Sequence, residues 1–181
     1  ISACLVGSEM CIRDRCTTWR ASGAEETTFA EIGARAAAFA HALHSDLGID
    51  GDQRVSTLLY NCAEHIEVMF AVAAKGAVFN PLNVQLMADQ IAYVVNHSES
   101  EVIVADPRLA EKLGAILRDC PTVRAVAFTG IAPLDDAASH LPDTVQVHSY
   151  EQLLDGRPTS YPWPELPENT AAALVLSLIH I

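Results

Sequence analysis

The sequence predicts an α/β fold in which a mainly parallel sheet is flanked by helices, forming part of a layered structure. Segments with the 3.6-residue period of helices alternate with short segments rich in β-branched residues. These strand-like segments carry apolar residues on both sides, as expected for parallel strands that helices cover on both faces. Half of the 181 residues are hydrophobic and no internal repeat occurs, which indicates one globular unit with a sizeable core.

The first predicted helix has both a start signal and a stop signal. Thr28 and Glu31 have the spacing of a capping box, in which a hydroxyl and a carboxylate satisfy the first backbone amides of a helix. Gly48 is expected to end the helix. The apolar face between them recurs at steps of three and four: Phe29, Ile32, Ala36, Phe39, Leu43 and Leu47.

The remaining elements follow by the same signals. Asn61 and Glu64 repeat the capping pattern before the second helix, and Asp106 with Pro107 marks a later helix start. A segment with four prolines, 158–167, is predicted to be a surface linker. The predicted strands are 54–59, 77–83, 101–105, 123–128, 145–150 and 171–174, and the predicted helices are 61–76, 88–97, 106–120 and 150–154.

Both ends differ in composition from the Ala-rich middle of the chain. The opening CLVGSEMCIRDR has no helical or alternating period, and it resembles a translated sequencing-adaptor read; the closing LSLIHI resembles another frame of the same kind. We therefore expect an artefactual leader over 1–16 and an artefactual tail over 175–181. Residues 17–174 are then a truncated natural segment.

Charge and hydropathy exclude several classes of partner. The formal net charge of −12 disfavours binding to nucleic acid or to an anionic membrane surface, because both need a basic footprint. No run reaches the roughly 20 apolar residues of a membrane-spanning helix. Because nothing resembles a signal peptide, we predict a cytoplasmic protein.

The five cysteines do not indicate a metal centre. Cys4, Cys11 and Cys16 are spaced C-x6-C-x4-C, which matches no common zinc ribbon. Zinc binding at this cluster is the least favoured of the functions considered. Cys62 and Cys120 are expected to be small buried side chains at helix positions.

Other polar residues have a functional and a structural interpretation. His41, His44 and Asp46 could approach one metal ion, but an exposed polar helix face is preferred. His97 is expected to lie at the C-terminus of a helix, where its imidazole interacts favourably with the helix dipole. This structural role is preferred to a catalytic one.

A further pair lies where a strand is predicted to end. Asn80 and Asn83 flank Pro81 and could line a crevice at the carboxyl end of a strand, but turn formation explains them without a ligand and is preferred. Asp135 and Asp136 are expected to lie in a solvated turn rather than to bind Mg²⁺.

Taken in order, several motifs resemble AMP-forming acyl-CoA synthetases of the fatty-acid–CoA ligase type. No single motif is specific to this family, but the order and spacing of the motifs over residues 29–174 are specific to it. The motifs are Thr28-Phe29-Ala30-Glu31-Ile32, Gly51-Asp52-Gln53-Arg54-Val55, Asn61-x-x-Glu64, Gly76-Ala77-Val78, Pro81-Leu82-Asn83-x-x-Leu86, Gln90-Ile91-Ala92-Tyr93 and Asn96-His97-Ser98-Glu99.

The resemblance implies the N-terminal subdomain of a two-step ligase. In that family a carboxylate and ATP give acyl-AMP, and the CoA thiol then forms the thioester, so the parent protein is expected to use a fatty acid, ATP, Mg²⁺ and CoA. Residues like 167–174 lead there into a Thr/Ser/Gly-rich phosphate loop that ends in Pro-Lys-Gly.

That loop does not occur among these 181 residues, and neither does G-x-x-x-x-G-K-S/T or G-x-G-x-x-G. We therefore assign no catalytic, cofactor-binding or metal-binding residue, expect no cofactor in this fragment, and expect it to be inactive. The alternative is a self-contained α/β binding module without catalysis.

Overall fold

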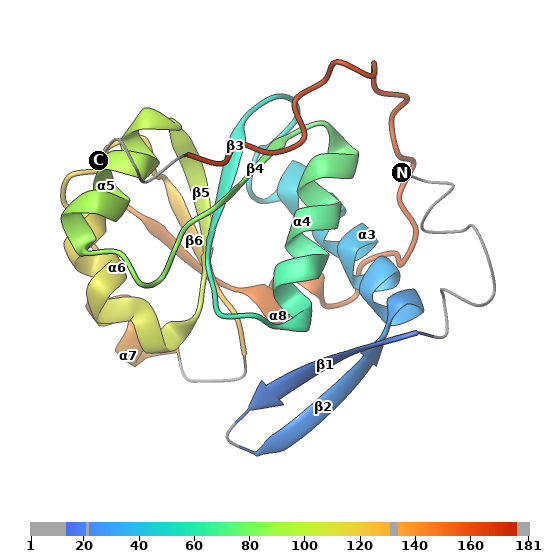
Figure 1. Cartoon of the computed structure of the whole chain (residues 1–181), viewed down its shortest axis with the longest axis horizontal. Helices are drawn as coiled ribbons and strands as arrows, with labels where there is room; N and C mark the ends of the chain where they lie inside the picture. Colours follow the sequence, from blue (N-terminus) through green and yellow to red (C-terminus); the bar gives the residue numbers. More distant parts are fainter. Residues whose placement is uncertain (1–13, 21, 131–133, 177–181) are drawn as a thin grey trace.

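A five-stranded parallel sheet with the strand order β4-β3-β5-β6-β7 forms the centre of the computed structural model (Figure 1). The structure describes residues 14–20, 22–130 and 134–176. The fold class predicted from the sequence is confirmed. The strands of the sheet are β3 (Arg54–Leu58), β4 (Val78–Pro81), β5 (Ser100–Ala105), β6 (Ala125–Phe128) and β7 (Gln146–Ser149).

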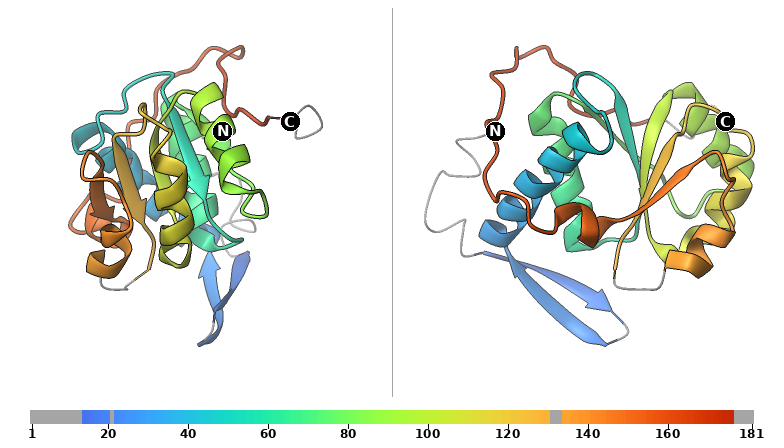
Figure 2. Two further views of the ribbon diagram at one scale, coloured as in Figure 1. Left: turned by 90° about the vertical axis from the view of Figure 1, so that its left-hand side faces the viewer. Right: turned by 180° about the vertical axis from the view of Figure 1, so that it is seen from behind.

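Helices cover both faces of this sheet (Figures 1 and 2). Successive residues of β5 point to opposite faces: Val102 and Val104 pack in one core, and Ile103 and Ala105 pack in the other. Because helices cover both faces, apolar side chains are needed on both sides of the strands. One face carries α3 (Phe29–Ser45), α4 (Ala63–Lys75) and α8 (Tyr150–Leu154), and the other carries α5 (Ala88–His97), α6 (Ala110–Leu117) and α7 (Leu134–Ser139).

The helix starts show where local sequence signals held and where they failed. The capping box is confirmed: Glu31 N donates to the Thr28 hydroxyl at 3.2 Å, and Thr28 N donates to the Glu31 carboxylate at 2.7 Å. The cap predicted from Asn61 and Glu64 is wrong, because the N-cap of α4 is Cys62 and its side chain makes no capping bond. The Glu64 carboxylate instead accepts a hydrogen bond from Arg20, which is distant in the sequence.

The start predicted at Asp106 is confirmed, with one refinement. The Asp106 carboxylate accepts from Arg108 N at 2.9 Å, but the first turn is a short 3₁₀ helix, η1 (Pro107–Leu109), before α6 begins. The strand predicted at 171–174 is wrong in extent. That segment makes one isolated parallel bridge, between Phe79 of β4 and Ala173.

An antiparallel hairpin, which the sequence patterns do not predict, precedes α3. It pairs β1 (Arg15–Arg20) with β2 (Gly23–Thr28) and projects from the end of the sheet where the strands finish (Figures 1 and 2). The boundary predicted at residue 16 falls inside β1 and stays a prediction. The rest of the predicted leader, 1–13, and most of the predicted tail, 177–181, lie outside the described residues.

The proline-rich segment 158–167 is confirmed as an irregular surface segment, and it wraps across α3 and α4 toward β4 (Figure 1). Tyr161 and Trp163 pack against the core beneath α3 and α4, and the Lys75 ammonium donates to the Tyr161 hydroxyl at 3.2 Å. Within the described ranges, no helix is both long and apolar enough to cross a membrane.

Candidate functional site

The candidate functional site is a crevice at the carboxyl ends of the parallel strands. The strand order reverses at β3, because β4 lies on one side of it and β5 on the other. In open α/β sheets the loops after the two strands at such a switch point diverge and leave a crevice where ligands bind. Here the loops after β3 and β5 and the hairpin enclose about 260 Å³, which we call the switch-point crevice.

An acid, a guanidinium and an aromatic ring form the floor of this crevice. The Asp106 carboxylate binds Arg108 through Nη2 at 2.5 Å, and the Arg108 guanidinium lies 4.9 Å from the centre of the Tyr60 ring. Burial alone would raise the pKa of Asp106, but the bonds from Arg108 outweigh it and hold that pKa below its usual range. Asp106 is therefore an anion near neutral pH, and Arg108 keeps an exposed face toward solvent.

The hairpin completes the crevice by capping α4. The Thr18 hydroxyl accepts a hydrogen bond from Ala63 N at 3.0 Å, although the two residues lie 45 positions apart. A side-chain oxygen from a distant strand thus replaces the cap that Cys62 does not provide. This contact fixes the hairpin against the helix N-terminus that lines the crevice.

We expect Thr18→Val to lower the free energy of unfolding by about 1 kcal/mol, because Ala63 N loses its side-chain acceptor while the β-branched shape is kept. Urea unfolding followed by circular dichroism measures the loss. Thr17→Val, at the exposed neighbouring position, is the matched control and should change stability by less than about 0.5 kcal/mol. Equal losses in both variants would contradict the capping role.

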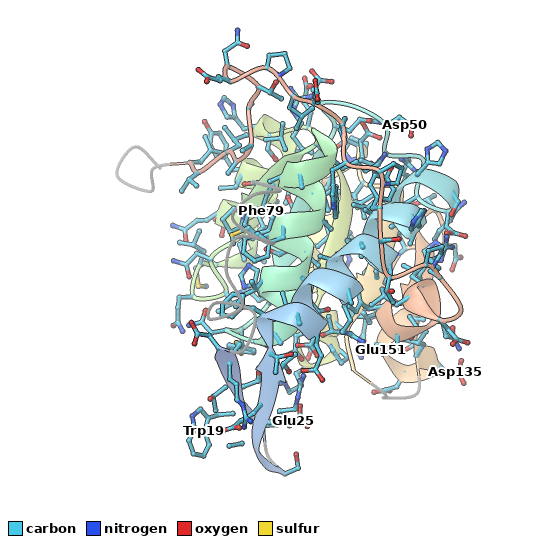
Figure 3. The ribbon with its side chains drawn as sticks, turned by 90° about the vertical axis from the view of Figure 1, so that its right-hand side faces the viewer. Trp19, Glu25, Asp50, Phe79, Asp135 and Glu151 are labelled. Atoms are coloured by element: carbon cyan, nitrogen blue, oxygen red, sulfur yellow. The ribbon has the colours of Figure 1, made fainter. Side chains whose placement is uncertain are left out.

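Arg20 links the switch-point crevice to a second cavity behind the hairpin. Its Nε donates to Glu25 and its Nη2 donates to Glu64, both at 2.5 Å. Figure 3 shows Glu25 on the hairpin and Trp19 projecting away from the helices, where 80% of the Trp19 side chain is exposed. The hairpin is thus held by charge pairs on one face while its tryptophan remains in solvent.

Among the described residues that line or border the crevice, Cys62 and His65 are not activated as nucleophiles. Burial raises the pKa of the Cys62 thiol to about 12, so this thiol is uncharged at neutral pH. Burial also lowers the pKa of His65, against the opposing effect of the Tyr60 carbonyl, and His65 Nε2 lies 2.9 Å from the Thr57 hydroxyl.

Asn80 and Asn83 do not line the crevice, which was the less favoured of their two interpretations. Asn80 is fully buried in the sheet, and its amide donates to the hydroxyls of Ser56 and Ser98 at 2.9 Å each. Asn83 forms the turn that the alternative interpretation predicted, since its side-chain oxygen accepts from Gln85 N at 2.9 Å. The parallel register places Asn80 beside Ser56, which the sequence alone does not reveal.

The histidines also have structural partners. His41 Nε2 lies 2.9 Å from the Ser160 carbonyl, whereas His44 binds Asp50 and Asp46 binds Arg157. His41, His44 and Asp46, which could approach one metal ion according to the sequence, therefore each bind a different partner. His97 is the last residue of α5, as predicted, and its ring stacks on Tyr93.

The remaining candidates make no metal centre among residues 14–20, 22–130 and 134–176, where no three His, Cys, Asp or Glu side chains are placed to share an ion. Cys62 is half-buried at the N-cap of α4, and Cys120 is buried just beyond the end of α6. Asp135 and Asp136 lie in the first turn of α7 rather than in a loop. Cys4 and Cys11 lie outside the described residues.

The fold defines the class: an open parallel α/β protein with a crevice at the switch point of its sheet. The family follows from sequence. Residues 10–174 match the AMP-binding enzyme family, so the chain belongs to that family.

Its relatives among characterised proteins are CoA ligases. A medium-chain-fatty-acid–CoA ligase of Ectopseudomonas oleovorans is 31% identical over 144 residues, which cover 80% of this chain and 26% of that protein. A 3-methylmercaptopropionyl-CoA ligase of Ruegeria lacuscaerulensis is 29% identical over 148 residues, which cover 82% of this chain and 26% of that protein. The chain thus spans about a quarter of the length of these relatives.

Solved structures share the fold. A mutant form of coronafacic acid ligase from Pectobacterium brasiliense aligns with a TM-score of 0.78 at 18% identity, over 96% of this chain and 32% of that one. A fatty acyl CoA synthetase of Mycobacterium tuberculosis aligns with a TM-score of 0.63 at 24% identity, over 84% of this chain and 27% of that one.

Proposed function

We propose that this chain is the N-terminal part of an AMP-forming fatty-acyl-CoA ligase. The parent would join a fatty acid to ATP, release pyrophosphate, and transfer the acyl group from acyl-AMP to the thiol of CoA. The observation that carries the proposal is the family match over residues 10–174, combined with 31% identity to a medium-chain-fatty-acid–CoA ligase. A cytoplasmic location, predicted from the sequence, is part of this proposal.

The role of this segment in the parent would be to supply one wall of the ligand site. The switch-point crevice lies at the edge of the sheet where open α/β proteins bind ligands. ATP, Mg²⁺ and CoA would be the cofactors of the whole enzyme. No residue of this segment is assigned to hold them.

We expect the 181-residue chain to show no fatty-acid-dependent exchange between ATP and pyrophosphate above the protein-free blank. Catalysis of this step relies on positioned backbone amides and cations around the phosphates, and the sequence contains no Gly-rich phosphate loop. The assay uses labelled pyrophosphate and a medium-chain fatty acid. Exchange by this chain alone would overturn the predicted inactivity.

A longer product of the same gene serves as the positive control. If the codons after Leu174 encode a Thr/Ser/Gly-rich loop ending in Pro-Lys-Gly, that product should catalyse the exchange. The acid is varied in parallel between a medium-chain fatty acid and 3-methylmercaptopropionate, because ligases for both are similarly related to this chain. Preference for the second acid would correct the substrate class, and no exchange with any acid would favour a binding module.

A further inference from the structure

Residues 164–174 cover the outer edge of β4, and we call this segment the edge flap. In the strand order β4-β3-β5-β6-β7, β4 is an end strand, so its side away from β3 has no neighbour within the sheet. The edge flap passes over the end of α4 and reaches β4 from that side (Figure 1). An uncovered strand edge is a template for pairing with another chain, and a loop that covers it prevents this.

Two backbone hydrogen bonds join the edge flap to β4. Phe79 N donates to the Ala172 carbonyl at 3.1 Å, and Leu174 N donates to the Phe79 carbonyl at 2.8 Å. On its other side β4 pairs with β3 over four residues, 54–57 with 78–81. The outer edge of β4 is therefore held by a much shorter ladder than the inner edge.

The chain immediately before the edge flap is firmly anchored. Tyr161 and Trp163 both pack against the core beneath α3 and α4, with their ring centres 4.9 Å apart. The Tyr161 hydroxyl also accepts a hydrogen bond from Lys75, whose ammonium group is buried at the end of α4. Any movement of the edge flap would therefore begin after Trp163.

The edge flap itself makes few packing contacts. None of residues 164–174 is buried, and Leu166, which is 37% exposed, is the one that meets the end of α4 closely. Its Cδ2 atom lies 2.9 Å from the position that a Cβ of Gly76 would occupy, so the side chain sits in a notch that only glycine leaves open.

A cavity of about 740 Å³ separates much of the edge flap from Ala73 and Ala74 of α4. The flap therefore spans this part of the helix instead of packing on it. Atoms that face such a space lack partners for dispersion contacts. Lifting the flap would consequently break little packing apart from the contact between Leu166 and Gly76.

We propose that the edge flap opens as a unit about a hinge after Trp163, while the sheet and the aromatic anchor stay folded. Leu166 in the notch at Gly76 is its latch. Segments with few buried apolar contacts open at a lower free-energy cost than the core to which they are attached. Opening exposes the N–H and C=O groups of Phe79, so the flap is a movable cover of the β4 edge.

The test is hydrogen–deuterium exchange of single amides in the 181-residue chain, followed by NMR. Phe79 N and Leu174 N bond across the flap, whereas Val78 N and Leu82 N donate at 2.9 Å to acceptors on the side of β3. After correction for intrinsic rates, the first pair should exchange at least about tenfold faster than the second. Low urea should accelerate only the second pair, because opening the flap exposes little new surface.

Leu166→Ala removes the latch and should accelerate exchange at Phe79 and Leu174 about fivefold or more, with Val78 and Leu82 unchanged. Glu165→Ala is the control, because this exposed neighbour in the flap makes no hydrogen bond or ion pair with any described residue. Equal protection of the two amide pairs in the unaltered chain, or an equal response to urea, would show that the flap opens only when the whole chain unfolds. Unchanged rates in Leu166→Ala would remove Leu166 as the latch.

Discussion

Arg35→Met should lower the free energy of unfolding by about 2–3 kcal/mol. The change leaves the carboxylate of Glu67 without its charged partner. This side chain is 1% exposed and accepts one of its two hydrogen bonds from Arg35. Removing one partner of a buried ion pair typically costs about 3–5 kcal/mol, and Arg35 belongs below that range because a third of its side chain is exposed. Urea unfolding at neutral pH measures the loss.

The control for this change is Arg118→Met, an exposed arginine at the end of α6, which should cost less than about 0.5 kcal/mol. Adding Glu67→Gln to Arg35→Met should recover part of the stability, because a neutral amide is cheaper to bury than an unpaired charge. A loss in Arg35→Met no larger than in Arg118→Met would show that the pair contributes little.

The pH dependence of this loss has a definite sign. Burial raises the pKa of Glu67 above its usual value, in spite of Arg35 and Tyr150. A carboxyl whose folded pKa is raised contributes most below its unfolded pKa of about 4.5 and loses that contribution as pH rises through the folded pKa. Without Arg35 the folded pKa rises further, so the deficit relative to the unaltered chain should be smaller at pH 5 than at pH 8.

Local periodicity was sufficient to predict the covered sheet and the described helices other than α7, whose residues were expected to form a turn. The capping box at Thr28 and the bounds 88–97 of α5 needed no tertiary information, because hydroxyl caps and apolar stripes act within one or two turns. To predict the order of the strands, tertiary information is required. The order depends on which edges pair, and the apolar strands are similar enough in sequence to allow several orders.

The hairpin could not be predicted, because its sequence lacks the alternation of a half-buried strand. Residues 23–28 read Gly-Ala-Glu-Glu-Thr-Thr, and only Thr18 of β1 is fully buried. Its stability comes from contacts with α4, namely the Thr18 cap and the Arg20–Glu64 ion pair. Such contacts join residues more than 40 positions apart, where single-sequence patterns carry no signal.

The same limit applies to the candidate site. Asn80 precedes a proline turn at a strand end, which allows a place in a crevice, but its face of the strand is set by pairing with Ser56. The spacing of Glu64 from Asn61 predicts a helix cap, and no local pattern indicates that Arg20 binds Glu64 instead. A signal did exist for Asp106, since the switch-point position after β5 follows once the strand order is known.

Gly114→Ala should lower the free energy of unfolding by about 2 kcal/mol or more, although alanine is the better helix former by about 1 kcal/mol. A Cβ at this position of α6 would lie 2.1 Å from the carbonyl oxygen of His140 and 3.0 Å from its carbonyl carbon. Because the added Cβ would meet backbone rather than a flexible side chain, the segment after α7 has to move. The free energy lost by this overpacking exceeds the gain in helix propensity. Thermal and urea unfolding both measure the change.

Gly33→Ala is the matched control, because it makes the same substitution in α3 where a Cβ would meet nothing within 4 Å. Here propensity acts alone, and the variant should be more stable than the unaltered chain by about 0.5–1 kcal/mol. Opposite signs for the two variants are therefore expected. If Gly114→Ala were stabilising as well, then α6 and the segment around His140 would not pack as closely as the structure places them.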